Sequence, residues 1–259
     1  MKLAASHIAW QPEEEPAALE ILKGNGFSGL EIVPPRVAGP RPYDNLEAAA
    51  SFAAGLRRGF GFVVCSMQSI WYGQTGSLFG PEREALLGYT QQAIRFAETM
   101  SCANLVFGCP KNRVRPEGQT DESAVDFFCR VGEEAARHGT VVALEANPPL
   151  YETNFINTTQ QALEMAKRVE HPAFKVNLDV GTMIENGEAP ALLEGQVAAL
   201  HHVHISEPGL VMLAPRPLHR ELAAVLRSEE YSGFVSIEMK GQSLADVARA
   251  AAYVAEVFA

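Results

Sequence analysis

The sequence predicts an α/β protein built as one closed (β/α)₈ barrel, the TIM-barrel fold. Short apolar, β-branched runs alternate eight times with longer helical patterns, which is typical of βαβ units and a parallel sheet. The length of 259 residues suits such a barrel, which needs about 250 residues. The loop after the first expected strand, HIAWQPEEEP, has no glycine, whereas an open doubly wound sheet usually carries a glycine-rich phosphate loop there. No linker or low-complexity segment divides the chain, so we expect a single domain over residues 1–259.

The expected elements follow one another in strict alternation. Strands are predicted at Leu3–Ala9, Gly29–Val33, Phe62–Met67, Leu105–Cys109, Val141–Ala146, Lys175–Asp179, His202–Ile205 and Val235–Met239. Helices are predicted at Pro16–Asn25, Asn45–Arg58, Arg83–Met100, Glu122–His138, Thr159–Val169, Ala189–Ala199, His219–Ser228 and Leu244–Phe258. Asp121 and the segment Asn157-Thr158-Thr159 are expected to cap two of these helices, because their side-chain oxygens can accept from first-turn N–H groups.

Composition argues against several kinds of partner. The formal net charge is −10 and the basic residues are scattered, so long-range electrostatics disfavour nucleic acid. No apolar run reaches the roughly 20 residues that cross a bilayer, and the first ten residues read as a strand, not a signal peptide. The four cysteines (Cys65, Cys102, Cys109 and Cys129) show no CxxC pairing, which favours a reducing, cytoplasmic compartment. A homo-oligomer stays open.

Four polar residues end apolar strand runs at the same relative place: Glu145, Asp179, His204 and Glu238. Their separations of 34, 25 and 34 residues each correspond to about one βα unit. They should therefore converge from the fifth to the eighth strand at the C-terminal mouth of the barrel. Taken singly, such a carboxylate is often a helix cap or a surface ion pair, and Asp179 could be a turn residue.

Together, the four groups would repel one another and lose hydration unless a cation joined them. Three carboxylates and one imidazole suit one divalent metal ion, with Mn²⁺ or Mg²⁺ favoured by the carboxylates and Co²⁺ or Zn²⁺ kept open by the imidazole.

Further residues near the expected mouth are candidates for binding substrate: His7, Glu31, Gln68, Asn147, His202 and Lys240. His202 shares strand parity with His204, because alternate side chains face the same side. Glu31 could instead form an ion pair with Arg36, and Lys240 could pair with a ligand carboxylate.

Four segments resemble the sugar phosphate isomerase/epimerase superfamily, the xylose isomerase-like TIM barrels that include ketose 3-epimerases and hydroxypyruvate isomerases. They are LEANPPLYETNFINT, KVNLDVGTM, HHVHISEP and GFVSIEMK, with weaker likeness in GFSGLEI. The family's four metal ligands fall on the four residues chosen above. Two places depart from the family: Thr182 stands where many epimerases have a histidine, and LVMLAPRPLH replaces a Gly-Glu-Gly stretch. Arg216 or His219 could supply the substrate contacts usually made there.

The resemblance implies a metal-dependent isomerase or epimerase. Its metal would chelate the carbonyl and an adjacent hydroxyl of an acyclic ketose and stabilise the ene-diolate formed on proton loss. Glu145 and Glu238 would remove and return the proton on opposite faces of the carbon. A sugar without phosphate is favoured, because no glycine-rich phosphate cradle is evident. The alternatives are a metal-dependent dehydratase on the same barrel, an endonuclease IV-like phosphodiesterase and a non-catalytic sugar-binding barrel.

Overall fold

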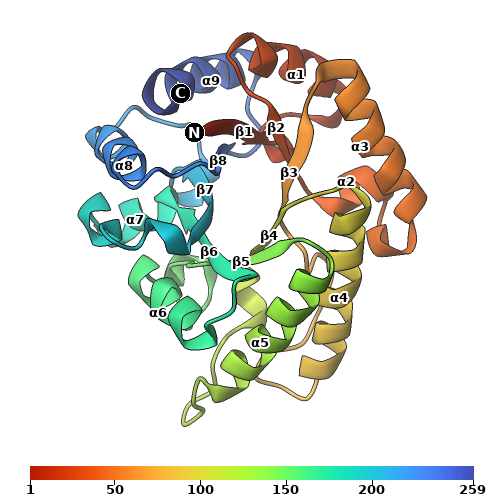
Figure 1. Cartoon of the computed structure of the whole chain (residues 1–259), viewed down its shortest axis with the longest axis vertical. Coiled ribbons are helices and arrows are strands. Elements are labelled where there is room, and N and C mark those ends of the chain that lie inside the picture. The colour runs from red at the N-terminus through yellow and green to blue at the C-terminus, as the bar shows by residue number, and fades with distance from the viewer.

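Eight parallel strands close into a barrel in the computed structural model, which describes all 259 residues. The strands are β1 (Lys2–Ser6), β2 (Gly29–Ile32), β3 (Val63–Met67), β4 (Asn104–Phe107), β5 (Val141–Glu145), β6 (Phe174–Asp179), β7 (Leu200–Ser206) and β8 (Phe234–Glu238). Each strand pairs with the next in the chain, and β8 pairs with β1 to close the ring. The predicted (β/α)₈ fold is therefore confirmed (Figure 1).

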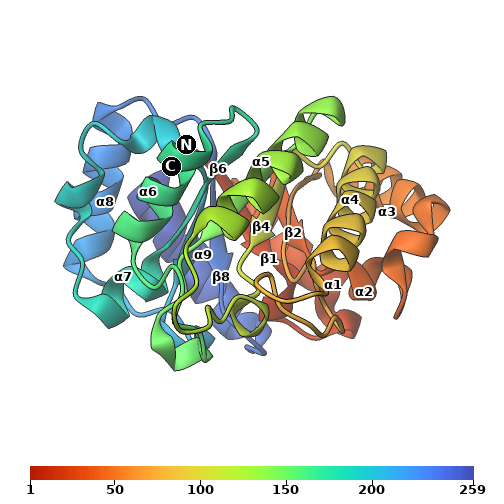
Figure 2. The same ribbon diagram turned by 90° about the horizontal axis from the view of Figure 1, so that it is seen from below.

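Helices surround the barrel on its outside. They are α1 (Glu15–Gly24), α2 (Pro34–Ala38), α3 (Leu46–Phe60), α4 (Arg83–Thr99), α5 (Glu122–Arg137), α6 (Thr159–Val169), α7 (Val180–Asn186), α8 (Pro217–Ser228) and α9 (Leu244–Phe258). A view turned by 90° shows α3 and α4 on one flank and α7 and α8 on the other (Figure 2). The first and last long helices, α1 and α9, pack together beside the closing strand pair. No helix is both long and apolar enough to cross a membrane.

The two faces of the barrel strands differ in chemistry. Outward-facing residues such as Leu144, Leu178 and Ile205 are buried under the helices. Many of the inward-facing residues are buried and polar, whereas many barrels fill this space with branched apolar side chains. They are Ser6, Glu31, Ser66, Gln68, Asn104, Asn177, His202, His204, Ser206 and Ser236. The interior is thus built around hydrogen bonds, and the apolar core lies between strands and helices.

One predicted helix is wrong. The stretch Ala189–Ala199 forms two short 3₁₀ turns, Pro190–Leu193 and Val197–Ala199. Gly195 between them has φ of 75°, a left-handed conformation that interrupts a helix. The helix of this unit is α7, which begins directly after β6 because the Asp179 side chain accepts a hydrogen bond from the Thr182 N–H and caps it.

One of the two predicted helix caps forms and the other does not. The Thr158 side chain caps α6 as predicted, in a reciprocal capping box with Gln161. Asp121 makes no capping hydrogen bond to α5; its carboxylate is instead paired with Arg115 and Arg168. The carboxylate of Asp121 therefore binds two guanidinium groups and not the N–H groups at the start of α5.

Candidate metal-binding active site

The four predicted ligands all lie at the C-terminal ends of adjacent strands. Glu145 ends β5, Asp179 ends β6, His204 lies near the end of β7, and Glu238 ends β8. The strand register places Asp179 opposite His204 and puts Glu238 one pleat further along, opposite Ser206. The sequence spacing therefore brings the four groups to one side of one barrel mouth.

His204 is the centre of this cluster. Its Nδ1 lies 3.1 Å from Glu145 Oε2 and 3.2 Å from Glu238 Oε2. Ligand atoms of Glu145, Asp179 and His204 all lie within 4.8 Å of one another. The cluster thus consists of three carboxylates grouped around one imidazole nitrogen.

Two amide side chains orient Glu145. Asn147 Nδ2 donates to Oε1 at 2.8 Å, and Asn177 Nδ2 donates to Oε2 at 2.6 Å. Arg113 supports this arrangement from a fully buried position, donating to the backbone oxygen of Glu145 and to Asn147 Oδ1. Because Asn147 is fixed by the guanidinium, its amide can present only N–H groups to Glu145.

Asp179 is held by the helix that follows its strand and by the neighbouring strand β7. Its Oδ1 accepts from the Thr182 N–H at 2.6 Å, and its Oδ2 accepts from Ser206 Oγ at 2.5 Å. The Thr182 hydroxyl donates to the carbonyl oxygen of Ala146 at 2.9 Å. Thr182 therefore binds the backbone beside β5, where its hydroxyl helps to join β5 to α7.

The electrostatics of the cluster are those of crowded, desolvated acids. Burial raises the pKa of Glu238. Together with the nearby charges of Glu145 and Asp179, and against the attraction of His204, it brings this pKa to about 7. Burial, reinforced by Glu145, raises the pKa of Asp179 to about 6. Burial opposes charge on His204, but the carboxylates of Glu31 and Glu238 outweigh it and raise the pKa of His204 well above its usual range. Protons and an imidazolium thus offset part of the negative charge here.

This donor set fits a divalent cation. Such an ion lies about 2.0–2.2 Å from its oxygen and nitrogen ligands, so the donors around it are about 3–4 Å apart. The spacings around His204 Nδ1 are close to that range, and small side-chain adjustments would complete it. A cation would also replace the protons that now offset the carboxylate charges.

Several residues expected to bind substrate are placed elsewhere. His7 and Glu31 are fully buried, and His202 is nearly so. His7 Nε2 accepts the Val33 N–H at 2.5 Å and faces away from the cluster. The burial of these three side chains argues against direct contact with a substrate in the mouth.

The expected ion pair of Glu31 with Arg36 is also absent. Arg36 pairs with Glu15 at 2.9 Å. The other pocket candidates differ in access. Gln68 and Asn147 line the mouth and are almost buried. Lys240 is exposed and pairs with no carboxylate, contrary to the expected contact with a ligand.

Arg216 is half exposed and reaches the C-terminal side of β7. Its guanidinium binds the buried carboxylate of Glu207 through two hydrogen bonds, at 2.7 and 2.5 Å. His219 is buried, and its Nδ1 lies 2.9 Å from the hydroxyl of Tyr253. Arg216 remains near enough to the mouth loops to be a candidate, whereas His219 packs between α8 and α9.

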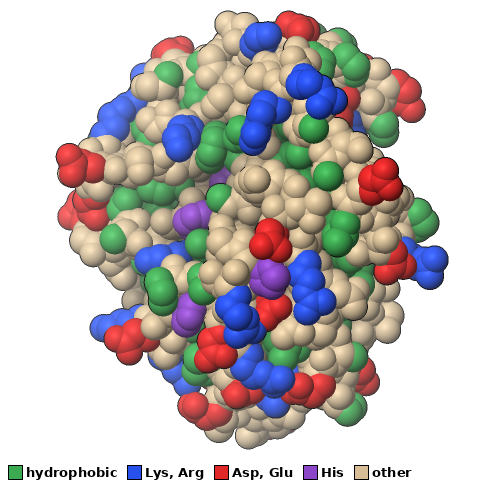
Figure 3. Space-filling view, turned by 45° about the vertical axis from the view of Figure 1, so that its right-hand side comes forward, with side chains coloured by type: hydrophobic (Ala, Val, Ile, Leu, Met, Phe, Trp, Pro, Cys, Tyr) green, Lys and Arg blue, Asp and Glu red, His purple; other side chains and the backbone are tan.

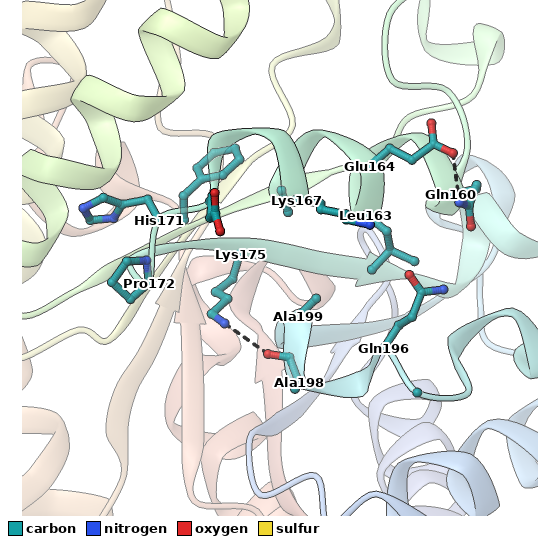
Figure 4. Close-up of a pocket in the computed structure, with 14 residues that line it drawn as sticks. Gln160, Leu163, Glu164, Lys167, His171, Pro172, Lys175, Gln196, Ala198 and Ala199 are labelled. Carbon is teal, nitrogen blue, oxygen red and sulfur yellow. Dashed lines mark hydrogen bonds between the residues drawn. The ribbon is translucent and has the colours of Figure 1, made fainter.

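One sizeable cavity lies away from this cluster. It is a groove of about 680 Å³ beside α6, lined among others by Lys167, His171 and Lys175 (Figure 4). Lys175 is the second residue of β6 and Ala198 lies two residues before β7, so the groove opens at the N-terminal ends of these strands. The four candidate ligands lie at the opposite end, where barrel active sites are built.

On the face drawn in Figure 3, basic and acidic side chains are interspersed without a continuous basic patch.

Sequence reasoning missed Asn177, Ser206 and Arg113. Asn177 precedes Asp179 by two residues and Ser206 follows His204 by two, so strand alternation could have placed both on the ligand face. Arg113 lies in the loop after β4, and no local pattern indicates that it folds back onto β5.

Fold and site together define a (β/α)₈-barrel protein with an acidic, single-histidine cluster at its C-terminal mouth. The chain belongs to the xylose isomerase-like TIM barrel family, whose model matches residues 19–257. No curated protein sequence matches it.

Solved structures with the same fold include several enzymes. D-psicose 3-epimerase from Clostridium cellulolyticum H10 is 18% identical with a TM-score of 0.76, covering 99% of this chain and 97% of its own. The 3-keto-D-glucoside 4-epimerase from E. coli is 21% identical with a TM-score of 0.75, covering 99% of both chains. A probable 3-DHS dehydratase from Bacillus anthracis is 17% identical with a TM-score of 0.69, covering 98% of both chains. At these identities the likeness concerns the fold.

Proposed function

We propose that this protein is a metal-dependent sugar epimerase or isomerase that moves a proton at the carbon beside a carbonyl group. The observation that carries the proposal is the pair of carboxylates, Glu145 and Glu238, that approach one imidazole nitrogen at 3.1 and 3.2 Å from strands on either side of it. Such a pair can remove a proton and return one. The two epimerases among the similar structures support the same reading.

Glu145, Asp179, His204 and Glu238 would hold one divalent ion, Mn²⁺ by preference. When bound, that ion supplies electrophilic stabilisation of the negative charge that develops on the substrate oxygen.

The two acids are restrained differently. Glu145 is fixed by two amide donors, whereas Glu238 contacts only His204. We assign Glu238 as the more mobile proton carrier and Glu145 as its partner on the other side of the substrate.

An uncharged sugar fits this mouth better than a sugar phosphate. Two cationic side chains of the mouth loops are already paired, Lys111 with Glu152 and Arg216 with Glu207, and the third, Lys240, is exposed to solvent. The N-terminus of α7, which could otherwise attract an anion, is capped by the carboxylate of Asp179. The substrate class we propose is therefore a ketose, or a related hydroxy-carbonyl compound, without phosphate.

Solvent exchange tests the proposal. Purified protein supplied with Mn²⁺ is incubated in D₂O with free ketohexoses and ketopentoses, and deuterium at the carbon beside the carbonyl is followed by NMR. Incorporation with formation of an epimer or an aldose isomer is the expected result. The Glu145→Gln/Glu238→Gln double variant is the control and should incorporate none.

Product analysis separates the alternatives in the same experiment. A product that has the composition of the sugar minus one water would show that the protein is a dehydratase and not an epimerase or isomerase. Absence of deuterium incorporation from every sugar, in protein that holds the metal, would overturn proton transfer as the activity.

A further inference from the structure

A buried carboxylate lies directly beneath the cluster. Glu31, on β2, is fully buried, and its Oε2 lies 2.9 Å from His204 Nε2. The same oxygen lies 3.2 Å from His202 Nε2, although that N–H is not aligned for a hydrogen bond. The other oxygen, Oε1, accepts from Gln68 Nε2 at 3.0 Å. Both oxygens of Glu31 are therefore occupied, one by Gln68 directly after β3 and the other by His204 of β7.

This contact decides which nitrogen of His204 faces the ligand cluster. A carboxylate can only accept hydrogen bonds, so His204 Nε2 must carry the proton that it shares with Glu31. When a cation is bound, Nδ1, on the other side of the ring, is then the only nitrogen that can offer it a lone pair. Nδ1 is also the nitrogen that faces Glu145 and Glu238.

Glu31 has no access to substrate. No part of it reaches solvent, and Gln68 and His204 separate it from the mouth. A second metal ion held by Glu31, His202 and His204 does not fit either. The three residues form a group of possible ligands, but all of them are buried and the site has no opening through which an ion could enter.

We propose that Glu31 is a positioning residue for the metal site: through His204 Nε2 it fixes the orientation and tautomer in which Nδ1 binds the ion. Gln68 contributes by holding Glu31 in place, since it donates both to Glu31 and to Ser6 Oγ on β1, at 2.6 Å. A chain of hydrogen bonds across the barrel interior thus ends at a metal ligand. The inference rests on the proposed metal-dependent function.

The test compares Mn²⁺ binding by the wild type, Glu31→Leu and Glu31→Gln, measured from the EPR signal of the free ion. Leucine removes the acceptor, whereas glutamine keeps a weaker, neutral one. Loss of a partner that orients a metal ligand typically weakens binding about 10–100-fold. We expect Glu31→Leu to fall in this range and Glu31→Gln to lie between it and the wild type.

A second readout reports the contact itself. In ¹⁵N-histidine-labelled, metal-free protein, the His204 Nε2–H should give an exchange-protected proton resonance that Glu31→Leu abolishes and Glu31→Gln shifts. Glu134→Gln is the matched control, because Glu134 is also a buried carboxylate but pairs with Arg137 on the surface of α5. This variant should leave both readouts unchanged.

The outcomes separate the two proposals. Wild-type protein that binds no Mn²⁺ overturns the proposed function and the role of Glu31 with it. Wild type that binds Mn²⁺ while both Glu31 variants bind it within twofold overturns the positioning role alone. If Glu31→Leu fails to fold, Glu31→Gln decides: weaker binding with a shifted resonance supports the role, and unchanged values refute it.

Discussion

Replacing Glu238 by glutamine should stabilise the metal-free protein at alkaline pH. The pKa of Glu238 rises from an ordinary 4.5 to about 7 because the carboxyl is buried among other acids. The native state therefore keeps a proton that the unfolded state loses between these pH values, so stability falls as pH rises through that window. Above pH 7 the native protein carries the full cost of the buried charge.

The size of the effect follows from the same values. A change from 4.5 to about 7 corresponds to about 3 kcal/mol, since each pKa unit is worth about 1.4 kcal/mol. For a chain of this length, 1 kcal/mol shifts Tm by about 2–4 °C. Glu238→Gln should thus raise Tm by about 6–12 °C at pH 8 in EDTA. The gain should shrink to less than about 1 kcal/mol at pH 5, where the native carboxyl is already protonated.

Differential scanning calorimetry in EDTA and in Mn²⁺ checks this prediction. Mn²⁺ at about 1,000 times Kd should reverse the order of the two proteins, because the wild type then gains about 4.1 kcal/mol of binding energy that the variant loses. Glu20→Gln, at an exposed position on α1 without an ion-pair partner, is the control for losing a negative charge. A Tm for Glu238→Gln equal to or below that of the wild type at pH 8 in EDTA would refute the reasoning.

Three further substitutions test other parts of the structure. Thr158→Ala removes the side-chain cap shared with Gln161 at the start of α6 and should lower the free energy of unfolding in urea by about 1 kcal/mol; no change would mean that the cap contributes nothing. Phe128→Ala opens the aromatic core, where the rings of Phe128 and Phe174 stack with their centroids 4.8 Å apart. This substitution should lower the free energy of unfolding in urea by about 3–5 kcal/mol. Asn177→Ala removes a donor to a ligand carboxylate and should weaken Mn²⁺ binding about 10-fold, measured by the free-ion EPR signal, whereas unchanged affinity would show that Asn147 alone orients that carboxylate.

The barrel was predictable because its signal is local and repeated. Apolar runs such as the one ending at Leu144 recur at the spacing of a βα unit, and each strand pairs with the next in the chain. The failure at Ala189–Ala199 is also local: the apolar residues there have a helix-like spacing, but Gly195 turns the backbone out of the helix. Such a short apolar run can pack against the barrel either as an α-helix or as separate 3₁₀ turns.

The candidate ligands were predictable for a different reason. Glu145, Asp179, His204 and Glu238 are polar residues at the ends of apolar strands, and the barrel topology brings strand ends together. The partners that orient them were not, with Arg113 the clearest case. It comes from the loop after β4 and binds Asn147 after β5, 34 residues further along the chain.

By itself, the sequence determined the strand order, the closed barrel and the four groups at its mouth, because hydrophobic periodicity and unit spacing are properties of neighbouring residues. Only the tertiary structure decided that Glu31 and His202 lie beneath the mouth and that Nδ1 of His204 faces Glu145 and Glu238. It also decided that Lys240 is exposed to solvent. The physical reason is that inward-facing side chains of a closed barrel meet partners from strands far apart in the chain. Hydrogen bonds across that interior depend on stagger and rotamer, and neither is encoded in a local pattern.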